Sequence, residues 1–139
     1  MAPRFAGIWR VESAEDLELL YEAMGLDDAV IDRVLEDHPT IEIRQHGDYF
    51  YIKNVTKVTG IIEASFKVGE IYELPTISGK KVRNKTDWVG GGKKLQIRPI
   101  GGKKEDPASV YELDGDKMIV TLYALGVSAR RTFVKVPDS

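Results

Sequence analysis

The sequence predicts an all-β protein, a ten-stranded antiparallel up-and-down β-barrel capped by two short helices. Three observations predict it. Residues 13–38 repeat their apolar positions with the helical period of about 3.6, whereas from Thr40 onward the period is two, as in strands. Glycine-containing turns interrupt the second part at short intervals, which is typical of consecutive antiparallel strands. Closing such strands into a barrel removes the unpaired edges that a flat sheet would expose.

The first strand is predicted over residues 5–12, and a helix is predicted to follow it directly. Ser13-Ala14-Glu15-Asp16 resembles a capping box with Asp in place of Glu or Gln. Gly25 is well placed as the left-handed residue that ends this helix. Its apolar stripe consists of Leu17, Leu20, Tyr21 and Met24.

A second helix is predicted between Gly25 and Pro39. Asp27 and Asp28 lie where the dipole of a helix N-terminus favours negative charge, and Pro39 ends the helix. Two helices of this length cannot cover both faces of ten strands, but they can cap one opening of a barrel. The apolar face of the second helix consists of Val30, Ile31, Val34 and Leu35.

Strands with clear alternation lie between the glycine turns. In the strand predicted from Lys80, the charged side chains alternate with an inward set that contains Asn84 and Thr86. These two are expected to be polar groups inside the barrel, able to bind water or a ligand. The clearest strands are predicted over residues 49–53, 61–67, 80–88, 110–113, 117–123 and 127–135.

The last predicted strand carries one arginine on its apolar face. Arg131 shares that face with Ala129 and Phe133, whereas Arg130 lies on the more polar face. An inward guanidinium is costly to desolvate unless something anionic meets it. Arg131 is therefore the candidate for binding the polar head of a small amphipathic molecule. The alternative is a structural arginine, neutralised by an inward acid or by ordered water.

Composition narrows the class of protein. The 139 residues are expected to form one domain, and a net charge of −2 without a basic run argues against nucleic-acid binding. The absence of cysteine excludes disulfides, thiolate catalysis and cysteine-based zinc sites. The sequence contains no apolar run of the kind that predicts an export signal or stable membrane insertion, so we expect a cytoplasmic protein.

The sequence offers little for catalysis. His38 adjoins a proline and His46 lies in a glycine turn, so neither is placed as a general base beside a nucleophile or as one of a metal-ligand pair. We therefore expect no enzymatic activity, no cofactor and no metal site.

Five segments, in order, resemble the intracellular lipid-binding proteins, the family of fatty-acid-binding and cellular retinoid-binding proteins. The resemblance implies a ten-stranded β-clam with a helix-turn-helix lid, and a fatty acid, retinoid or similar ligand bound without catalysis in an internal cavity. The segments are residues 5–10 (FAGIWR), the helix pair with Gly25, residues 63–69 (EASFKVG), Lys81-Val82 and residues 131–133 (RTF).

The resemblance also implies a ligand-binding set, with departures. The family's carboxylate-binding set is two arginines and a tyrosine on the last strands. Here Arg131 matches the second arginine, Tyr111 stands in place of the first, and Phe133 in place of the tyrosine. Asp16-Leu17 also replaces the usual asparagine and aromatic residue of the first helix, and one extra residue stands between positions 47 and 69.

The entry portal is implied to lie between the second helix and the turns near residues 54–59 and 75–79. Val34, Val58 and Ile77 would line it, and Leu17 and Tyr21 of the first helix would complete the ligand contacts.

The sequence thus predicts a monomeric cytoplasmic carrier of a long-chain fatty acid or similar lipid. Two alternatives stay open. One is a retinoid-type carrier, which Tyr111 and Phe133 favour because they make the site less demanding of a carboxylate. The other is a protein-interaction module that keeps the barrel without a ligand.

Overall fold

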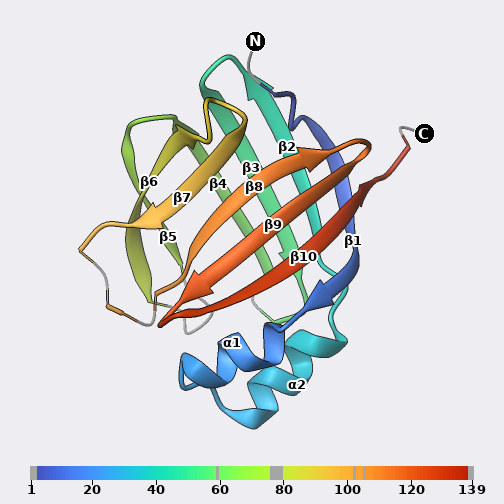
Figure 1. Cartoon of the computed structure of the whole chain (residues 1–139), viewed down its shortest axis with the longest axis vertical. Coiled ribbons are helices and arrows are strands. Elements are labelled where there is room, and N and C mark those ends of the chain that lie inside the picture. Colours follow the sequence, from blue (N-terminus) through green and yellow to red (C-terminus); the bar gives the residue numbers. More distant parts are fainter. Residues whose placement is uncertain (1–2, 59, 76–79, 102, 105, 138–139) are drawn as a thin grey trace.

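The computed structural model describes residues 3–58, 60–75, 80–101, 103–104 and 106–137, and it confirms the predicted fold. Within these residues, ten strands and two helices follow one another along the chain (Figure 1). In order they are β1 (Gly7–Glu15), α1 (Leu17–Ala23), α2 (Asp28–Glu36), β2 (Thr40–His46), β3 (Tyr49–Thr56), β4 (Gly60–Lys67), β5 (Ile71–Pro75), β6 (Lys81–Val89), β7 (Lys94–Pro99), β8 (Ala108–Asp114), β9 (Lys117–Ala124) and β10 (Val127–Lys135).

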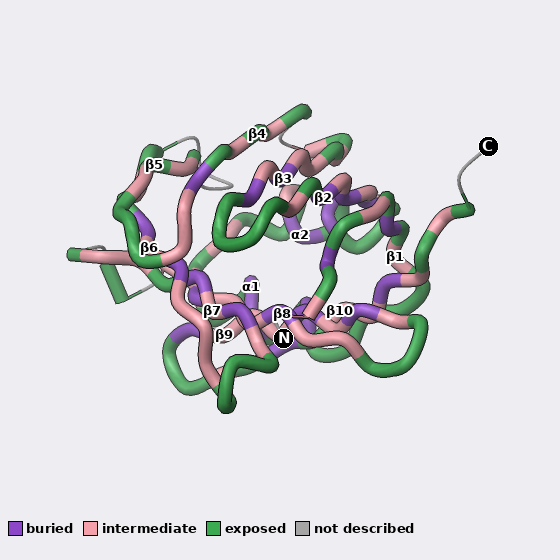
Figure 2. Tube along the Cα trace, turned by 90° about the horizontal axis from the view of Figure 1, so that it is seen from above, coloured by how far each residue is buried: buried purple, intermediate pink, exposed green. Residues whose placement is uncertain are grey.

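The strands form one antiparallel sheet that curls into a nearly closed barrel. The order is β4-β3-β2-β1-β10-β9-β8-β7-β6-β5, so the first strand pairs with the last and the ends of the sheet are β4 and β5. These two lie beside each other without ladder pairing among the described residues. Seen from above, the strands run in a ring with both helices beyond one opening (Figure 2). No helix in the described part of the chain is long and apolar enough to span a bilayer.

The junction of β1 and α1 corrects the predicted helix start. Ser13 and Glu15 pair with Thr132 and Arg130 of β10, so β1 continues through the predicted capping box. Asp16 adopts a left-handed conformation with φ 59°, and its side chain forms no capping hydrogen bond. Backbone N–H and C=O groups at the end of β1 form ladder hydrogen bonds with β10, so these groups need no local side-chain cap.

The predicted end of α1 is confirmed. Gly25 has φ 80°, and its N–H donates to the carbonyl of Glu22. The next N–H, of Leu26, donates to the carbonyl of Tyr21 over 3.2 Å. This pair of bonds is a Schellman motif, which satisfies two of the carbonyls left open at a helix end.

The apolar face of α2 is narrower than predicted. Ile31 and Val34 are buried, and Val30 packs partly against them, whereas Leu35 is 43% exposed. The helix ends at Glu36, three residues before Pro39. α2 therefore packs against its neighbours through about one buried side chain per turn.

Two apolar clusters fill the molecule. The larger lies within the barrel and contains stacked aromatic rings, with the Phe66 and Tyr72 centroids 4.4 Å apart. The smaller, which we call the lid cluster, joins the helices to β9 and β10 and contains Leu17, Leu20, Tyr21, Ile31, Val34, Ala124 and Ala129. Members of both clusters line the cavity described next.

Candidate ligand-binding site

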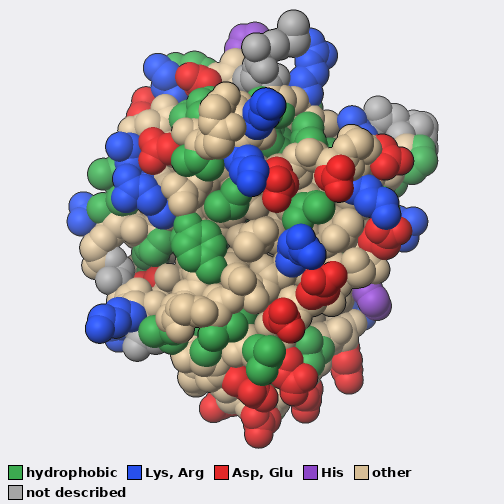
Figure 3. Space-filling view, in the orientation of Figure 1, with side chains coloured by type: hydrophobic (Ala, Val, Ile, Leu, Met, Phe, Trp, Pro, Cys, Tyr) green, Lys and Arg blue, Asp and Glu red, His purple; other side chains and the backbone are tan. Residues whose placement is uncertain are grey.

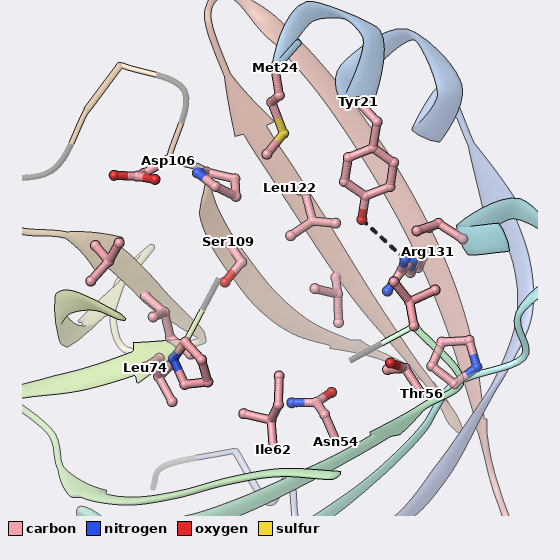
Figure 4. Close-up of a pocket in the computed structure, with 18 of the residues that line it drawn as sticks. Tyr21, Met24, Asn54, Thr56, Ile62, Leu74, Asp106, Ser109, Leu122 and Arg131 are labelled. Carbon is pink, nitrogen blue, oxygen red and sulfur yellow. Dashed lines mark hydrogen bonds between the residues drawn. The ribbon is translucent and has the colours of Figure 1, made fainter. Parts of the chain in front are cut away.

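A cavity of about 640 Å³ lies inside the barrel beneath the helices. This volume falls within the roughly 300–1,000 Å³ that is usual for small-molecule sites. A second cavity of about 190 Å³ adjoins it, and the two share wall residues that include Asn54 and Tyr111. Most of the wall is apolar, and the polar groups discussed below stand at separate points along it (Figure 4).

Arg131 lines this cavity, as the strand alternation predicts. Its neighbour Arg130 points outward and forms an ion pair of 3.3 Å with Glu15, while Ala129 and Phe133 are buried. Arg131 forms no ion pair with a carboxylate among the described residues. No carboxylate of the described residues therefore neutralises Arg131 by an ion pair, although Asp37 and Asp106 also line the cavity.

Two tyrosines interact with this guanidinium, Tyr21 by a hydrogen bond and Tyr111 electrostatically. Nη2 of Arg131 donates a hydrogen bond of 3.3 Å to the hydroxyl of Tyr21, which is 8% exposed (Figure 4). Because the Tyr21 oxygen accepts this bond, its own proton remains available to a second acceptor.

Tyr111 is the second of these tyrosines. Burial raises the pKa of Tyr111 to about 12, although the charge of Arg131 acts in the opposite direction. The Tyr111 hydroxyl therefore stays protonated and can donate, and it forms no hydrogen bond with another described residue. One cation and two phenols thus stand at the same end of the site.

The other predicted contact residues divide into three groups. Phe133, Val34 and Val58 line the main cavity. Leu17 is buried in the lid cluster instead and is not among the residues that form the cavity wall, because its side of α1 packs onto β9 and β10. Ile77 lies outside the described residues.

The interior polar residues predicted on β6 are buried. Asn84 is 8% exposed, lines the cavity and donates to the carbonyl of Val82 over 3.0 Å. Thr86 is fully buried, and its hydroxyl shares a hydrogen bond of 2.6 Å with that of Tyr72. Thr86 therefore serves the packing of the barrel rather than the cavity.

The sequence reasoning missed Asn54 and Thr56 on β3, Ser109 on β8 and Met24 on the lid, all of which line the cavity. For Asn54 and Thr56, the sequence of β3 contains a pattern that predicts their inward position. Phe50 and Ile52 begin an inward series with a period of two, and continuing it by four residues reaches Asn54 and Thr56. The predicted strand ends at residue 53, where the sequence predicts a turn, so the prediction leaves out the last three residues of β3.

The described residues contain no group of three His, Cys, Asp or Glu side chains that could hold a metal ion. What the arrangement can do is enclose an elongated apolar molecule and meet an anionic group at Arg131.

No protein-family model matches the chain, but individual proteins do. Cellular retinoic acid-binding protein 1 of Gallus gallus is 34% identical over 138 residues, which cover 96% of this chain and 98% of that protein. The human protein of the same name is 35% identical with the same coverage. Cellular retinoic acid-binding protein 2 of Mus musculus is 31% identical over 137 residues, covering 96% of this chain and 99% of the mouse protein.

Solved structures share the fold over nearly the whole chain. Human cRBP IV superimposes with a TM-score of 0.85 at 23% identity, covering 96% of this chain and 99% of that one. The REP1-NXSQ fatty acid transporter gives 0.85 at 25% identity, covering 96% and 97%. A Schistosoma mansoni fatty acid binding protein in complex with arachidonic acid gives 0.84 at 21% identity, covering 96% of both chains.

Proposed function

The chain belongs to the intracellular lipid-binding protein family, and from that premise we propose that it binds and carries a long-chain fatty acid, without catalysis, with the carboxylate at Arg131. Carriage of a hydrophobic ligand follows from the family, whose relatives named above are binding and transport proteins. The choice of a fatty acid and the position of its head group are the proposal.

The observation that carries the proposal is the guanidinium of Arg131 in a largely apolar cavity, without a carboxylate partner among the described residues. A charge-assisted hydrogen bond contributes roughly 1.5–3 kcal/mol. A carboxylate placed there would complete the coordination of Arg131 that Tyr21 begins over 3.3 Å. The Tyr111 hydroxyl supplies a further neutral donor on the same side.

The apolar wall supplies the larger part of the binding free energy. Burying a dozen methylenes at ~0.8 kcal/mol each contributes about 10 kcal/mol. Adding roughly 2 kcal/mol for the head group and subtracting about 4 kcal/mol or more for association leaves around 8 kcal/mol, which corresponds to a micromolar Kd. The apolar acyl chain of the ligand therefore supplies most of the affinity, whereas the head-group contacts determine which ligand is preferred.

Retinoic acid is the second candidate, because the relatives at 34% and 35% identity carry its name. It offers the same carboxylate to Arg131 on a stiffer apolar body. A cavity of about 640 Å³ accommodates either class by size.

Native mass spectrometry before and after delipidation tests the proposal, followed by titration of the delipidated protein with a saturated long-chain fatty acid and with retinoic acid. We expect a retained lipid and a one-to-one complex with the fatty acid, of equal or higher affinity than that with retinoic acid. Tighter binding of retinoic acid would select the second candidate. Binding of neither acid would defeat both.

The carrier is further proposed to act as a monomer in the cytoplasm, built as one domain over residues 1–139. The absence of cysteine, which suits a reducing compartment, supports the location. Sedimentation of the lipid-loaded protein at 15.6 kDa would support the monomer, and twice that mass would refute it.

A further inference from the structure

Asn54 is a polar side chain set in an apolar part of the cavity wall. Its cross-strand partners are Ile41 on β2 and Ile62 on β4. All three residues line the main cavity. The Asn54 side chain forms no hydrogen bond with another described residue. Because both lateral neighbours are isoleucines, the amide can find a partner only in the cavity or along its own strand.

An unpaired amide affects ligand binding because it offers two N–H donors and one carbonyl oxygen as an acceptor. The hydroxyl of Ser109, which also lines the cavity, has one donor, whereas the amide of Asn54 has two. When a ligand displaces water from Asn54 with hydrocarbon alone, the unpaired amide weakens binding by roughly tenfold. A ligand that carries an oxygen at this point avoids that loss.

Asn54 also marks a branch point. It lines both the main cavity and the smaller one, which continues past it to Ile52, Ala64 and Phe66. A chain whose carboxylate lies at Arg131 on β10 can therefore run past Asn54 on β3 and place its apolar end in the smaller cavity. Figure 4 shows Asn54 and Arg131 on separate strands, both facing the space between them. The oxygen that meets Asn54 would accordingly lie part-way along the ligand and not at either end.

We propose that the preferred ligand is an oxygenated long-chain carboxylic acid, with a hydroxyl or oxo group near mid-chain that binds the amide of Asn54. The proposal rests on the proposed function, since it takes the carboxylate to lie at Arg131. It adds the chemical class of the ligand and a second polar subsite, formed by Asn54 on β3.

Calorimetric titration with three probes tests this subsite: octadecanoic acid, the same acid hydroxylated at mid-chain, and the same acid hydroxylated at its terminal carbon. We expect the mid-chain hydroxy acid to bind more tightly than the plain acid. Asn54→Leu should lower the ratio of these two affinities by about tenfold, because it removes the amide while keeping the number and branching of the side-chain heavy atoms. The terminal isomer should show no such change.

The matched control is Ile62→Val, which alters the wall beside Asn54 without changing its polarity and should leave the affinity ratio within about twofold. Asn54→Val provides a second variant suited to a strand if the leucine variant does not fold. An affinity ratio that is the same in the wild type and the Asn54 variants would overturn the subsite while leaving the proposed function intact. If the wild type bound none of the three acids, the proposed function itself would fail.

Discussion

The hydroxyl of Tyr21 on α1 accepts a hydrogen bond from Nη2 of Arg131 on β10, over 3.3 Å, so the lid and the barrel wall meet at one of the cations that line the cavity (Figure 4). The separation is slightly beyond the roughly 2.7–3.2 Å of a typical N–H···O bond. A carboxylate is a stronger acceptor than a phenol and can take this donor without breaking a tight contact. The two residues are therefore placed to act on the same head group.

Replacing Arg131 by alanine should weaken the binding of a fatty acid more than that of the matching alcohol, because the two ligands differ in charge. We expect the acid to lose about 10- to 100-fold in affinity, as for one or two charge-assisted hydrogen bonds, and the alcohol to lose less than about fivefold. Calorimetric titration of both ligands measures the difference. Equal losses would assign Arg131 to structure instead.

Tyr21→Phe keeps the ring in the lid cluster and removes only the hydroxyl. We expect about three- to tenfold weaker binding of the fatty acid, measured by displacement of a fluorescent lipid. Tyr51→Phe is the matched control, because its hydroxyl bonds Glu63 over 2.9 Å at an exposed site away from the cavity. Comparable losses in the two variants would contradict a contact between Tyr21 and the head group.

The sequence predicts those parts of the molecule in which one local period dominates. β10 occupies the predicted range, and Arg131 faces inward because Ala129 and Phe133 fix the register. The start of α1 was predicted wrongly because the pairing of Ser13 with β10 is a contact between distant segments, which a local capping pattern does not reveal. Cavity residues such as Asn54 depend on where a strand ends, the least certain feature of a periodic pattern.

The stability of the folded protein should fall at high pH because of Tyr111. Burial raises its pKa to about 12, whereas an unfolded tyrosine titrates near 10. The unfolded state therefore releases this proton first, so the stabilisation is complete below about pH 10 and is lost as the pH rises toward about 12.

Urea unfolding at about pH 8 and about pH 11 should show a smaller loss for Tyr111→Phe than for the wild type, by about 1.4 kcal/mol, since only about one pH unit of the shift is lost by pH 11. Burial also raises the pKa of Tyr72, so part of the loss should remain in this variant. An identical pH dependence in the two proteins would show that Tyr111 titrates normally.

Val58 packs against the lid cluster and lines the cavity, and the sequence predicts it at the entry portal. Val58→Ala should raise the association and dissociation rates together by about threefold or more and leave the Kd within a few-fold, because it widens a path and removes few contacts from the bound state. Stopped-flow fluorescence measures both rates. Val55→Ala, on the 39% exposed outer position of β3, is the control, and rates unchanged in both variants would exclude this location.

The lid end of the molecule is acidic, and acidic side chains gather over it (Figure 3). Residues 27–37 contain five acidic side chains and one basic side chain, Arg33, a net charge of −4. Anionic lipid attracts basic residues by about 1 kcal/mol each near the surface and repels acidic ones. We therefore expect ligand transfer to vesicles by release into water, at a rate nearly independent of vesicle concentration and of anionic lipid content.

Fluorescence transfer to acceptor vesicles measures this rate. Asp28→Lys combined with Asp32→Lys should make transfer accelerate with anionic vesicles, because both side chains are exposed on α2. Wild-type transfer that rises in proportion to vesicle concentration would instead indicate docking through another surface, such as that around Lys57.

The pairing of β1 with β10 also determines when a binding site can exist during synthesis. Trp9 lies opposite Lys135, so the first strand finds this neighbour only after the residues up to 135 have left the ribosome. Until then β1 and β9 are two further open edges, and the strand that carries Arg131 is missing. A stalled or shortened product without β10 would therefore expose apolar strands and lack Arg131.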